Sequence, residues 1–323
     1  MRIALLGKVA SVTHWLEDCA AAWRADGHEV RVEVTRDPAV NAAIERLLLS
    51  DALGAPMAAR MARGVRTFSP DLIVVIGAYH QPPVILERIA ALPHRPPIIG
   101  WVGDVFSAQA ARAAKALDAV AYTDSGLQSL HEDLGFSTPC IFLPHAVDPR
   151  AGAAVSPGER RGMVFIGNPT DYRRQIVSSL RSPISLYGAG WAATPTLGHG
   201  PAHKIVARRV AKDAIWQIYG SHLAALNIRN EINVISGLNQ RNFEPCIVGA
   251  AVVAEHQPDL ERCFEPGREV LVYRDADELN ALHDRVMADK GEIRAICDAG
   301  RARVLADHTF RRRLQTMRAF LGA

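Results

Sequence analysis

The stretch QRNFEPCIVGAAVVA (residues 240–254) shows how this chain is built. It predicts a helix start that carries Arg241 and Glu244, followed by a buried strand over residues 251–254. The segment FEPGREV (residues 264–270) then predicts a glycine turn. In an open α/β sheet this layout puts a cation and a carboxylate at the carboxyl ends of the strands, where ligands with phosphates and hydroxyls usually bind.

The rest of the chain alternates short apolar runs with amphipathic stretches, which is typical of βαβ units and a parallel sheet. In the first half we predict strands at residues 3–6, 30–34, 72–76, 98–102, 119–122 and 140–143. The helices predicted between them cover residues 12–25, 42–68, 108–116 and 125–134. In the second half we predict strands at residues 163–166, 184–187, 223–228, 251–254 and 270–273. The helices predicted there cover residues 171–180 and 211–219, a segment from residue 243, and residues 277–288, 290–306 and 309–320.

Length and composition favour two soluble α/β domains. The 323 residues, 49% of them apolar, suffice for two separate cores, and the aperiodic residues 150–161 are the best candidate for a linker. The net charge of +3 comes from scattered Lys and Arg residues, so no nucleic-acid or membrane tail is expected.

Cellular location is inferred from the apolar runs and the cysteines. The apolar start of the chain is too short for a signal peptide, and no apolar run is long enough to span a membrane, so we expect a cytoplasmic protein. The five cysteines contain no C-x-x-C pair, which indicates reduced core thiols, with a reactive thiol at Cys246 as the alternative.

Three motifs share the pattern of one family. They are R-x-x-E-x-x-x-x-G (residues 241–249), F-x-x-G-x-E (residues 264–269) followed by Tyr273 and Asp275, and His308-Thr309 with Arg312. In these positions the chain resembles the group-1 glycosyltransferases of GT-B architecture, and among them the CgeB-like (spore maturation protein-like) branch. The segment PHAVDP (residues 144–149) is similar to the crossing point between the two halves of that family, with Ala146 where the family usually has Gly.

The resemblance implies two Rossmann-like domains that face a cleft. Residues 1–150 would bind the acceptor, residues 151–308 would bind a nucleotide-sugar donor, and a C-terminal helix (residues 309–323) would pack back on the first domain. It implies transfer of a sugar without a cofactor, with retention of the anomeric configuration as in typical group-1 relatives. The acceptor could be a saccharide, a protein or a lipid.

A departing diphosphate can be stabilised without a metal by arginines and by the amides at a helix N-terminus. Gly167 and Asn168 end a predicted strand, and Arg173 and Arg174 match the arginine that the CgeB-like pattern places after its F-x-G turn. The alternative for both arginines is an exposed first helical turn. Gly188 begins a G-A-G-W turn that the family shares, although a glycine after a strand is equally a plain turn residue.

Glu244 aligns with the second of two glutamates that bracket this loop in group-1 enzymes, the one that holds the ribose hydroxyls. The first, which holds the donor sugar, is replaced by Ser236, so that role would fall to residues 233–239 or to Arg241. The alternatives are a glutamate favoured by the helix macrodipole and a surface arginine.

Polar side chains gather after the predicted strand 223–228. They include Asn227, Asn239 and Asn242, which we take as further donor-binding candidates, although loops of this composition also form turns. Lys204, Arg208 and Arg209 lie in a helix-like segment and would contact phosphate or form a solvated face.

Loops after the strands of the first half should line the acceptor side. They are residues 7–11, 77–80, 103–104 and 123–125. Asp104 could hold or deprotonate an acceptor hydroxyl, or it could cap the next helix. His14, His80 and His145 are further candidates for a base, and we take His80 as the catalytic one. The alternative for each is a structural or surface histidine. If the transfer inverts the configuration, Asp104 or a histidine should be the base.

No motif predicts a metal site. There is no H-E-x-x-H, and the D-x-D at residues 275–277 precedes a helix that Asp275 would cap. We therefore expect metal-independent chemistry. Two other functions stay open at this point, a nucleotide-sugar epimerase with the same fold and a non-catalytic sugar-nucleotide-binding or assembly module.

Overall fold

The computed structural model describes residues 1–7, 13–34, 51–153, 155, 158–193 and 200–322. These form two compact units, Met1–Pro144 together with Phe310–Ala323, and His145–Thr309. Each unit holds one six-stranded sheet in which every strand pair is parallel. The predicted fold class, α/β with two Rossmann-like domains, is confirmed.

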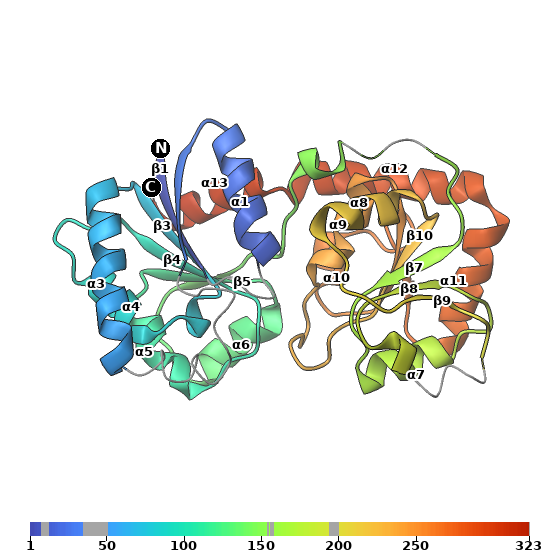
Figure 1. The fold of residues 1–323 in the computed structure, drawn as a ribbon, viewed down its shortest axis with the longest axis horizontal. Helices are drawn as coiled ribbons and strands as arrows, with labels where there is room; N and C mark the ends of the chain where they lie inside the picture. The colour runs from blue at the N-terminus through green and yellow to red at the C-terminus, as the bar shows by residue number, and fades with distance from the viewer. Residues whose placement is uncertain (8–12, 35–50, 154, 156–157, 194–199, 323) are drawn as a thin grey trace. The chain divides into compact units, whose positions relative to one another are not determined.

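The sheet of the first unit has the order β2-β1-β3-β4-β5-β6 (Figure 1). Its strands are β1 (Arg2–Gly7), β2 (Glu29–Val34), β3 (Leu72–Ile76), β4 (Ile98–Val102), β5 (Ala119–Tyr122) and β6 (Cys140–Phe142). Every residue of β3 and β4 is buried, as expected for central parallel strands covered on both faces. The chain turns from one side of β1 to the other between β2 and β3, so the switch point lies between β1 and β3.

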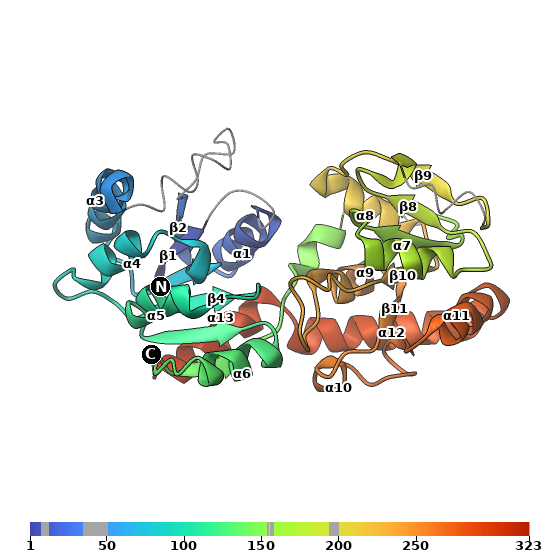
Figure 2. The ribbon, with the colours of Figure 1, turned by 90° about the horizontal axis from the view of Figure 1, so that it is seen from below.

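Helices cover both faces of this sheet. They are α1 (Thr13–Ala25), α3 (Asp51–Phe68), α4 (Pro83–Ala90), α5 (Ala111–Lys115), α6 (Ser125–Asp133) and α13 (Phe310–Leu321), with short 3₁₀ turns η1 (Ala78–His80) and η2 (Ala108–Ala110). Helices α3 and α4 pack on one face, and α1 and α13 lie on the other (Figures 1 and 2). Helix α13 is fixed there by the Trp23 indole, which donates to the Phe310 carbonyl at 2.9 Å, and by Arg313, which donates to the Pro144 carbonyl at 2.6 Å.

The sheet of the second unit has the order β12-β11-β10-β7-β8-β9. Its strands are β7 (Met163–Ile166), β8 (Ser185–Tyr187), β9 (Lys204–Val206), β10 (Ala224–Asn227), β11 (Ala251–Glu255) and β12 (Leu271–Tyr273). From β7 the chain proceeds outward through β8 and β9, then returns to β10 on the opposite side of β7. This is the strand order of dinucleotide-binding domains, and its switch point lies between β7 and β10.

The helices of the second unit are α7 (Asp171–Ser178), α8 (Lys212–Gly220), α9 (Glu244–Ile247), α10 (Leu260–Cys263), α11 (Ala276–Ala288) and α12 (Lys290–Asp307). Short 3₁₀ turns include η3 (Pro149–Gly152), η4 (Trp191–Ala193) and η6 (Gln240–Asn242). Side chains from α7, α11 and α12 share one core with β7, β8, β10 and β11, while α8 and α9 contact each other and the strands β7 and β11 respectively.

Three local predictions need correction or completion. Lys204 begins the strand β9 instead of lying in a helix, because residues 204–206 pair in register with residues 185–187 of β8. The helix α4 was not predicted, although Pro83 at its first turn is a favourable start. The helix predicted from residue 243 is a 3₁₀ turn followed by the four-residue α9. Residues 42–50 of the predicted helix 42–68 lie outside the described residues.

Candidate active site

The end of β7 packs tightly against the turn that follows β8. The Gly167 amide donates to the Tyr187 carbonyl at 2.8 Å, and the buried Trp191 indole donates to the Gly167 carbonyl at 2.7 Å. A Cβ on Gly188 would lie 2.1 Å from that same carbonyl oxygen, so only glycine fits there. A Cβ on Gly167 would lie 2.9 Å from the Phe165 ring, so close packing accounts for both predicted glycines and fixes the course of residues 167–168 at the switch point.

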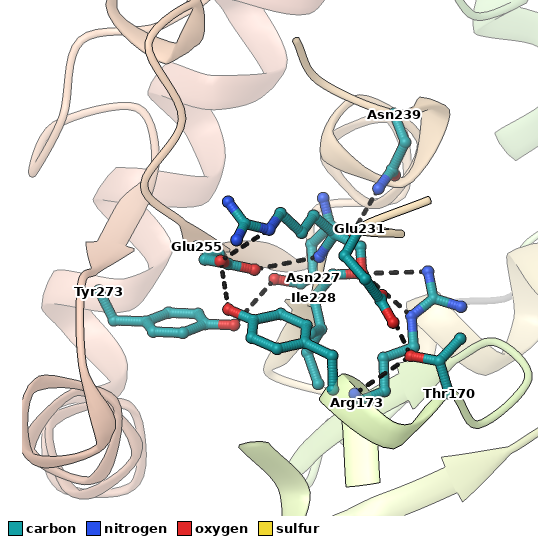
Figure 3. A network of polar contacts seen from close by, with 10 residues as sticks. Thr170, Arg173, Asn227, Ile228, Glu231, Asn239, Glu255 and Tyr273 are labelled. Atoms are coloured by element: carbon teal, nitrogen blue, oxygen red, sulfur yellow. Dashed lines mark hydrogen bonds and ion pairs between the residues drawn. The ribbon is translucent and has the colours of Figure 1, made fainter. Parts of the chain in front are cut away.

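Arg173 joins the loops on the two sides of the switch point. Arg173 is 5% exposed, and its guanidinium donates to the Ile228 carbonyl at 3.3 Å (Figure 3). It also donates to the carbonyls of Asn168 at 3.0 Å and Arg229 at 3.2 Å. Burial, together with the positive charge of Arg241, lowers the pKa of Arg173 to about 10. Because these bonds all go to backbone carbonyls, Arg173 holds the loop after β7 to the loop after β10.

Arg174 and Thr170 lie at the start of α7. Thr170 caps the helix, because its Oγ1 accepts from the Arg173 amide at 3.3 Å, and its hydroxyl donates to Glu231 at 3.1 Å (Figure 3). Arg174 pairs with Asp171 at 2.7 Å within the first turn. Arg174 therefore has the geometry of an ordinary first-turn ion pair, whereas Arg173 does not.

A buried carboxylate ends β11 beside the same loop. Glu255 accepts from the Tyr172 hydroxyl at 2.5 Å and from the Arg229 amide at 3.2 Å, and the Arg229 side chain lies 3.4 Å from it. Burial and the Glu255 hydrogen bond raise the pKa of Tyr172. Glu255 is a site residue that the sequence pattern did not predict, because the predicted strand ends at Ala254. A polar residue at the carboxyl end of a central strand was the available signal.

The three predicted asparagines bind one another. Asn239 Nδ2 donates to Asn227 Oδ1 at 3.1 Å, and Asn227 Nδ2 donates to Asn242 Oδ1. Asn239 also caps η6, because its Oδ1 accepts from the Arg241 amide at 2.9 Å. We call Asn227, Asn239 and Asn242 the amide triad. It fixes η6 to the end of β10 and so determines where the backbone places Arg241 and Glu244.

Arg241 and Glu244 lie in the same electrostatic neighbourhood, and both are partly exposed. Burial raises the pKa of Tyr219 on α8, the negative charge of Glu244 raises it further, and the positive charge of Arg241 opposes this rise. Arg241 also acts on Arg173, as described above. Arg241 in η6 and Glu244 at the start of α9 lie on the segment that the amide triad fixes to the end of β10, beside the switch point.

A pocket of about 260 Å³ opens at the carboxyl ends of β8 and β9. Its walls are mainly apolar, with two arginines at the edge; the lining includes Tyr187, Val206, Arg208, Arg209, Ala214 and Ile218. It neighbours the Gly188 turn in the chain, and its size suits a small planar group.

In the first unit, His80 and Asp104 form a pair at the ends of β3 and β4. His80 Nε2 lies 3.2 Å from Asp104 Oδ2, and the side chains are 40% and 33% exposed. Asp104 does not cap the next helical turn, since Ser107 does so by accepting from the Gln109 amide at 3.4 Å. A histidine oriented by a carboxylate at the open edge of a sheet can act as a base.

A chain of hydrogen bonds fixes the turn that carries His80. The hydroxyls of Tyr79 and Tyr122 are 2.7 Å apart, and the Tyr122 hydroxyl is 2.7 Å from His131 Nδ1. Burial raises the pKa of Tyr79 to about 12 and lowers the pKa of His131.

Of the other acceptor-side candidates, Asp124 caps α6, because its side chain accepts a hydrogen bond from the Gly126 amide. Most of the loop 7–11 and the side chain of His14 lie outside the described residues, and His145 belongs to the second unit.

The chain is similar to known proteins in part of its sequence and in its fold. Residues 172–319, less than half of the chain, match a family model described as glycosyl transferase-like. No curated protein matches the chain. Among solved structures, Anabaena HepE in complex with UDP-glucose is similar at 13% identity and a TM-score of 0.68, over 100% of this chain and 99% of that one. Sucrose-phosphate synthase from Thermosynechococcus elongatus is similar at 13% identity and a TM-score of 0.67, over 100% and 98%. The lipopolysaccharide outer core galactosyltransferase WaaB is similar at 12% identity and a TM-score of 0.65, over 99% of both chains.

The chain has the fold of these enzymes. It is the GT-B architecture, with one Rossmann-like sheet in each unit. In this GT-B chain the predicted donor-site residues divide into two groups. Gly167, Gly188, Arg173 and the amide triad are bound internally and shape the edge of the sheet. The second group is accessible at that edge and consists of the exposed Asn168 and the partly exposed Arg174, Arg241 and Glu244.

Other predicted features of the GT-B chain concern metals, membranes and thiols. Asp275 caps α11 by accepting from the Glu278 amide at 2.9 Å, which confirms the interpretation of the D-x-D motif. Within the described ranges, no three His, Cys, Asp or Glu side chains gather as a metal would need, and no helix could cross a bilayer. Cys246 is buried and its pKa is raised by burial, which favours a core thiol over a reactive one.

Proposed function

We propose that this chain transfers a sugar from a nucleotide-sugar donor to a hydroxyl group of an acceptor. The single observation that carries the proposal is the placement of Arg241 and Glu244 by the amide triad at the switch point of the second unit. The glycosyl transferase-like match and the fold shared with HepE, which was solved with UDP-glucose, support it.

In this proposal each part of the donor has a matching group. Arg241 and the amides at the start of α7 neutralise the diphosphate, because a guanidinium and a helix N-terminus both favour anions. Glu244 accepts hydrogen bonds from the ribose hydroxyls. The nucleobase enters the pocket lined by Tyr187 and Val206.

The acceptor binds at the edge of the first unit that carries His80 and Asp104. The resemblance to group-1 enzymes implies retention, in which the departing diphosphate itself can take the acceptor proton. The His80–Asp104 pair at 3.2 Å favours the alternative, in which the protein supplies the base and the configuration inverts. We propose His80 as the base and Asp104 as the residue that orients it.

The donor site is tested with Glu244→Ala. We expect one member of a panel of UDP-, GDP-, dTDP-, ADP- and CMP-sugars to stabilise the wild type selectively. Glu244→Ala should weaken that binding roughly 10- to 100-fold, because two charge-assisted hydrogen bonds to the ribose are lost. Titration calorimetry measures the affinity, and mass spectrometry measures nucleotide release.

The matched control is Glu261→Ala, which removes an exposed glutamate of α10 and should leave the affinity unchanged. Equal affinity of Glu244→Ala and the wild type would refute the donor site. Release of an isomerised nucleotide sugar without acceptor would identify an epimerase. Tight binding without turnover across acceptors would identify a binding module.

We further propose that the transfer needs no metal ion. Arg241 and helix amides can neutralise the developing diphosphate charge as a divalent cation would. Turnover after dialysis against EDTA should therefore match the untreated rate, measured by nucleotide release. A loss of turnover that Mg²⁺ or Mn²⁺ restores would show that the arginine and amides do not suffice.

A further inference from the structure

A cavity of about 500 Å³ lies at the amino ends of the strands of the second unit. Leu223 and Gly249 line it, and they come just before β10 and β11. The proposed donor site is assigned to the carboxyl ends of these strands, so the cavity lies at the opposite edge of the sheet. Pockets that bind small molecules commonly measure about 300–1,000 Å³, so this cavity has room for a ligand of its own.

Three cationic side chains reach this cavity from two segments. Arg160 comes from the segment before β7, and Lys290 and Arg294 come from α12. Lys290 and Arg294 are four residues apart, so they lie on the same face of the helix. Both are exposed, and neither side chain forms a hydrogen bond or an ion pair with another described residue. We call Arg160, Lys290 and Arg294 the cation triad.

Arg160 is the member of the cation triad that the protein holds in place. Its Nη2 donates to the Val248 carbonyl at 2.5 Å. Gly249 has a φ of 71°, and a Cβ there would lie 3.2 Å from both Nη1 and Nη2, so glycine lets the guanidinium lie against the backbone. This accounts for the last residue of the R-x-x-E-x-x-x-x-G motif, which the donor site does not use. A guanidinium has more N–H donors than this bond occupies, and the others are available to a ligand.

Two carboxylates also line the cavity, and they leave positive charge in excess. Glu159 accepts from Arg161 at 2.6 Å. This hydrogen bond lowers the pKa of Glu159, and the nearby charge of Lys290 lowers it further. Among the described lining residues, Asp298 on α12 is then the one carboxylate that opposes the cation triad.

An apolar surface adjoins the cations. Ile293 and Cys297 line the cavity and are 2% and 7% exposed. Burial raises the pKa of the Cys297 thiol to about 11, and the charge of Arg160 opposes this rise, so the guanidinium lies near that surface. A ligand that fills the cavity therefore meets positive charge on one side and apolar side chains on the other.

This combination selects the type of ligand. A phosphate dianion matches a guanidinium, which can bind two of its oxygens, and it also matches an ammonium group. Inorganic phosphate alone would leave the apolar surface uncovered. We propose that the cavity binds a phosphate monoester, whose phosphate contacts the cation triad and whose organic group packs on Ile293 and Cys297. The site does not depend on the proposed transferase function.

The test uses calorimetric titration of the whole chain with glycerol phosphate, phenyl phosphate and inorganic phosphate. We expect at least one of the two esters to bind at least about 3-fold more tightly than inorganic phosphate, because its organic group covers apolar surface. Arg294→Gln and Lys290→Gln should each weaken ester binding roughly 10-fold, since each removes one charge-assisted contact. Both positions are exposed on α12, so both variants should keep the unfolding midpoint of the wild type.

Arg274→Gln, at an exposed arginine just after β12, is the matched control and should not change the affinity. Arg241→Ala should not change it either, because Arg241 belongs to the proposed donor site. Absence of ester binding, or unchanged affinity in both α12 variants, would overturn the inference. Loss of binding in Arg241→Ala alone would place the phosphate at the donor site, which also overturns it. Inorganic phosphate that binds as tightly as both esters would refute the assignment of a monoester.

Discussion

Replacing Arg173 by methionine is expected to lower the midpoint of thermal unfolding by roughly 6–12 °C and to abolish nucleotide-sugar binding. The buried guanidinium donates to the backbone carbonyls of Asn168, Ile228 and Arg229. A methionine side chain has no hydrogen-bond donor to replace it. The bond to Ile228 is buried and the other two are partly buried. Leaving a buried carbonyl unmatched costs about 1–3 kcal/mol and a partly buried one less, so we place the total at ~3 kcal/mol. Binding is lost because the loops on both sides of the switch point separate.

The neighbouring Arg174 provides a matched control. Arg174→Met removes the ion pair with the fully exposed Asp171, and such surface pairs contribute about 0.5 kcal/mol or less. The midpoint of thermal unfolding of Arg173→Lys should lie between those of Arg173→Met and Arg174→Met, because a single ammonium group cannot span three carbonyls. Scanning calorimetry measures the midpoints. Equal midpoints for Arg173→Met and Arg174→Met would show that the guanidinium does not hold the loops together.

The contacts of Arg173 could not be predicted from the sequence. Its position after the F-x-G turn singled it out, but its partners Ile228 and Arg229 lie 55 and 56 residues further along the chain. The alternation of strands and helices predicted the fold class, because apolar runs report burial directly. It did not reveal that β7 lies beside β10, since strand order depends on contacts between distant segments.

The amide triad shows a second limit of prediction from sequence. The polar residues around the strand end predict Asn227, Asn239 and Asn242 as donor contacts. The structure shows their side chains bonded to one another, so they position η6. Composition locates a polar edge, but it does not distinguish the residues that build the edge from those that face a ligand.

Short elements set the limits of the local predictions. The strand β9 has three residues, too few for a period to appear, and its pairing with β8 decides its structure. The predicted strand ends at Ala254, one residue before Glu255. The hydrogen bonds of Glu255 with Tyr172 and Arg229 make burial of the carboxylate favourable, and neither partner is near it in the sequence.

Substitution of His80 by asparagine is expected to lower kcat for transfer by about 10²- to 10⁴-fold, the usual contribution of a general base. Its Nε2 lies 3.2 Å from Asp104 Oδ2, and an asparagine cannot accept the acceptor proton. Donor affinity should be unchanged, because the donor site is assigned to the second unit. Asp104→Asn should lower kcat as well, since the ring of His80 loses the carboxylate that orients it.

The anomeric configuration of the product decides what a loss of activity in His80→Asn means. An α-linked donor should give a β-linked product, observed by NMR, if His80 deprotonates the acceptor on the face opposite the leaving diphosphate. The control is His94→Asn, in which an exposed histidine with a φ of 53° is replaced by a residue that tolerates this backbone. An α-linked product together with near-normal kcat in His80→Asn would assign the proton to the diphosphate and establish retention, as the resemblance to group-1 enzymes implies. An α-linked product with greatly reduced kcat would instead limit His80 and Asp104 to positioning the acceptor.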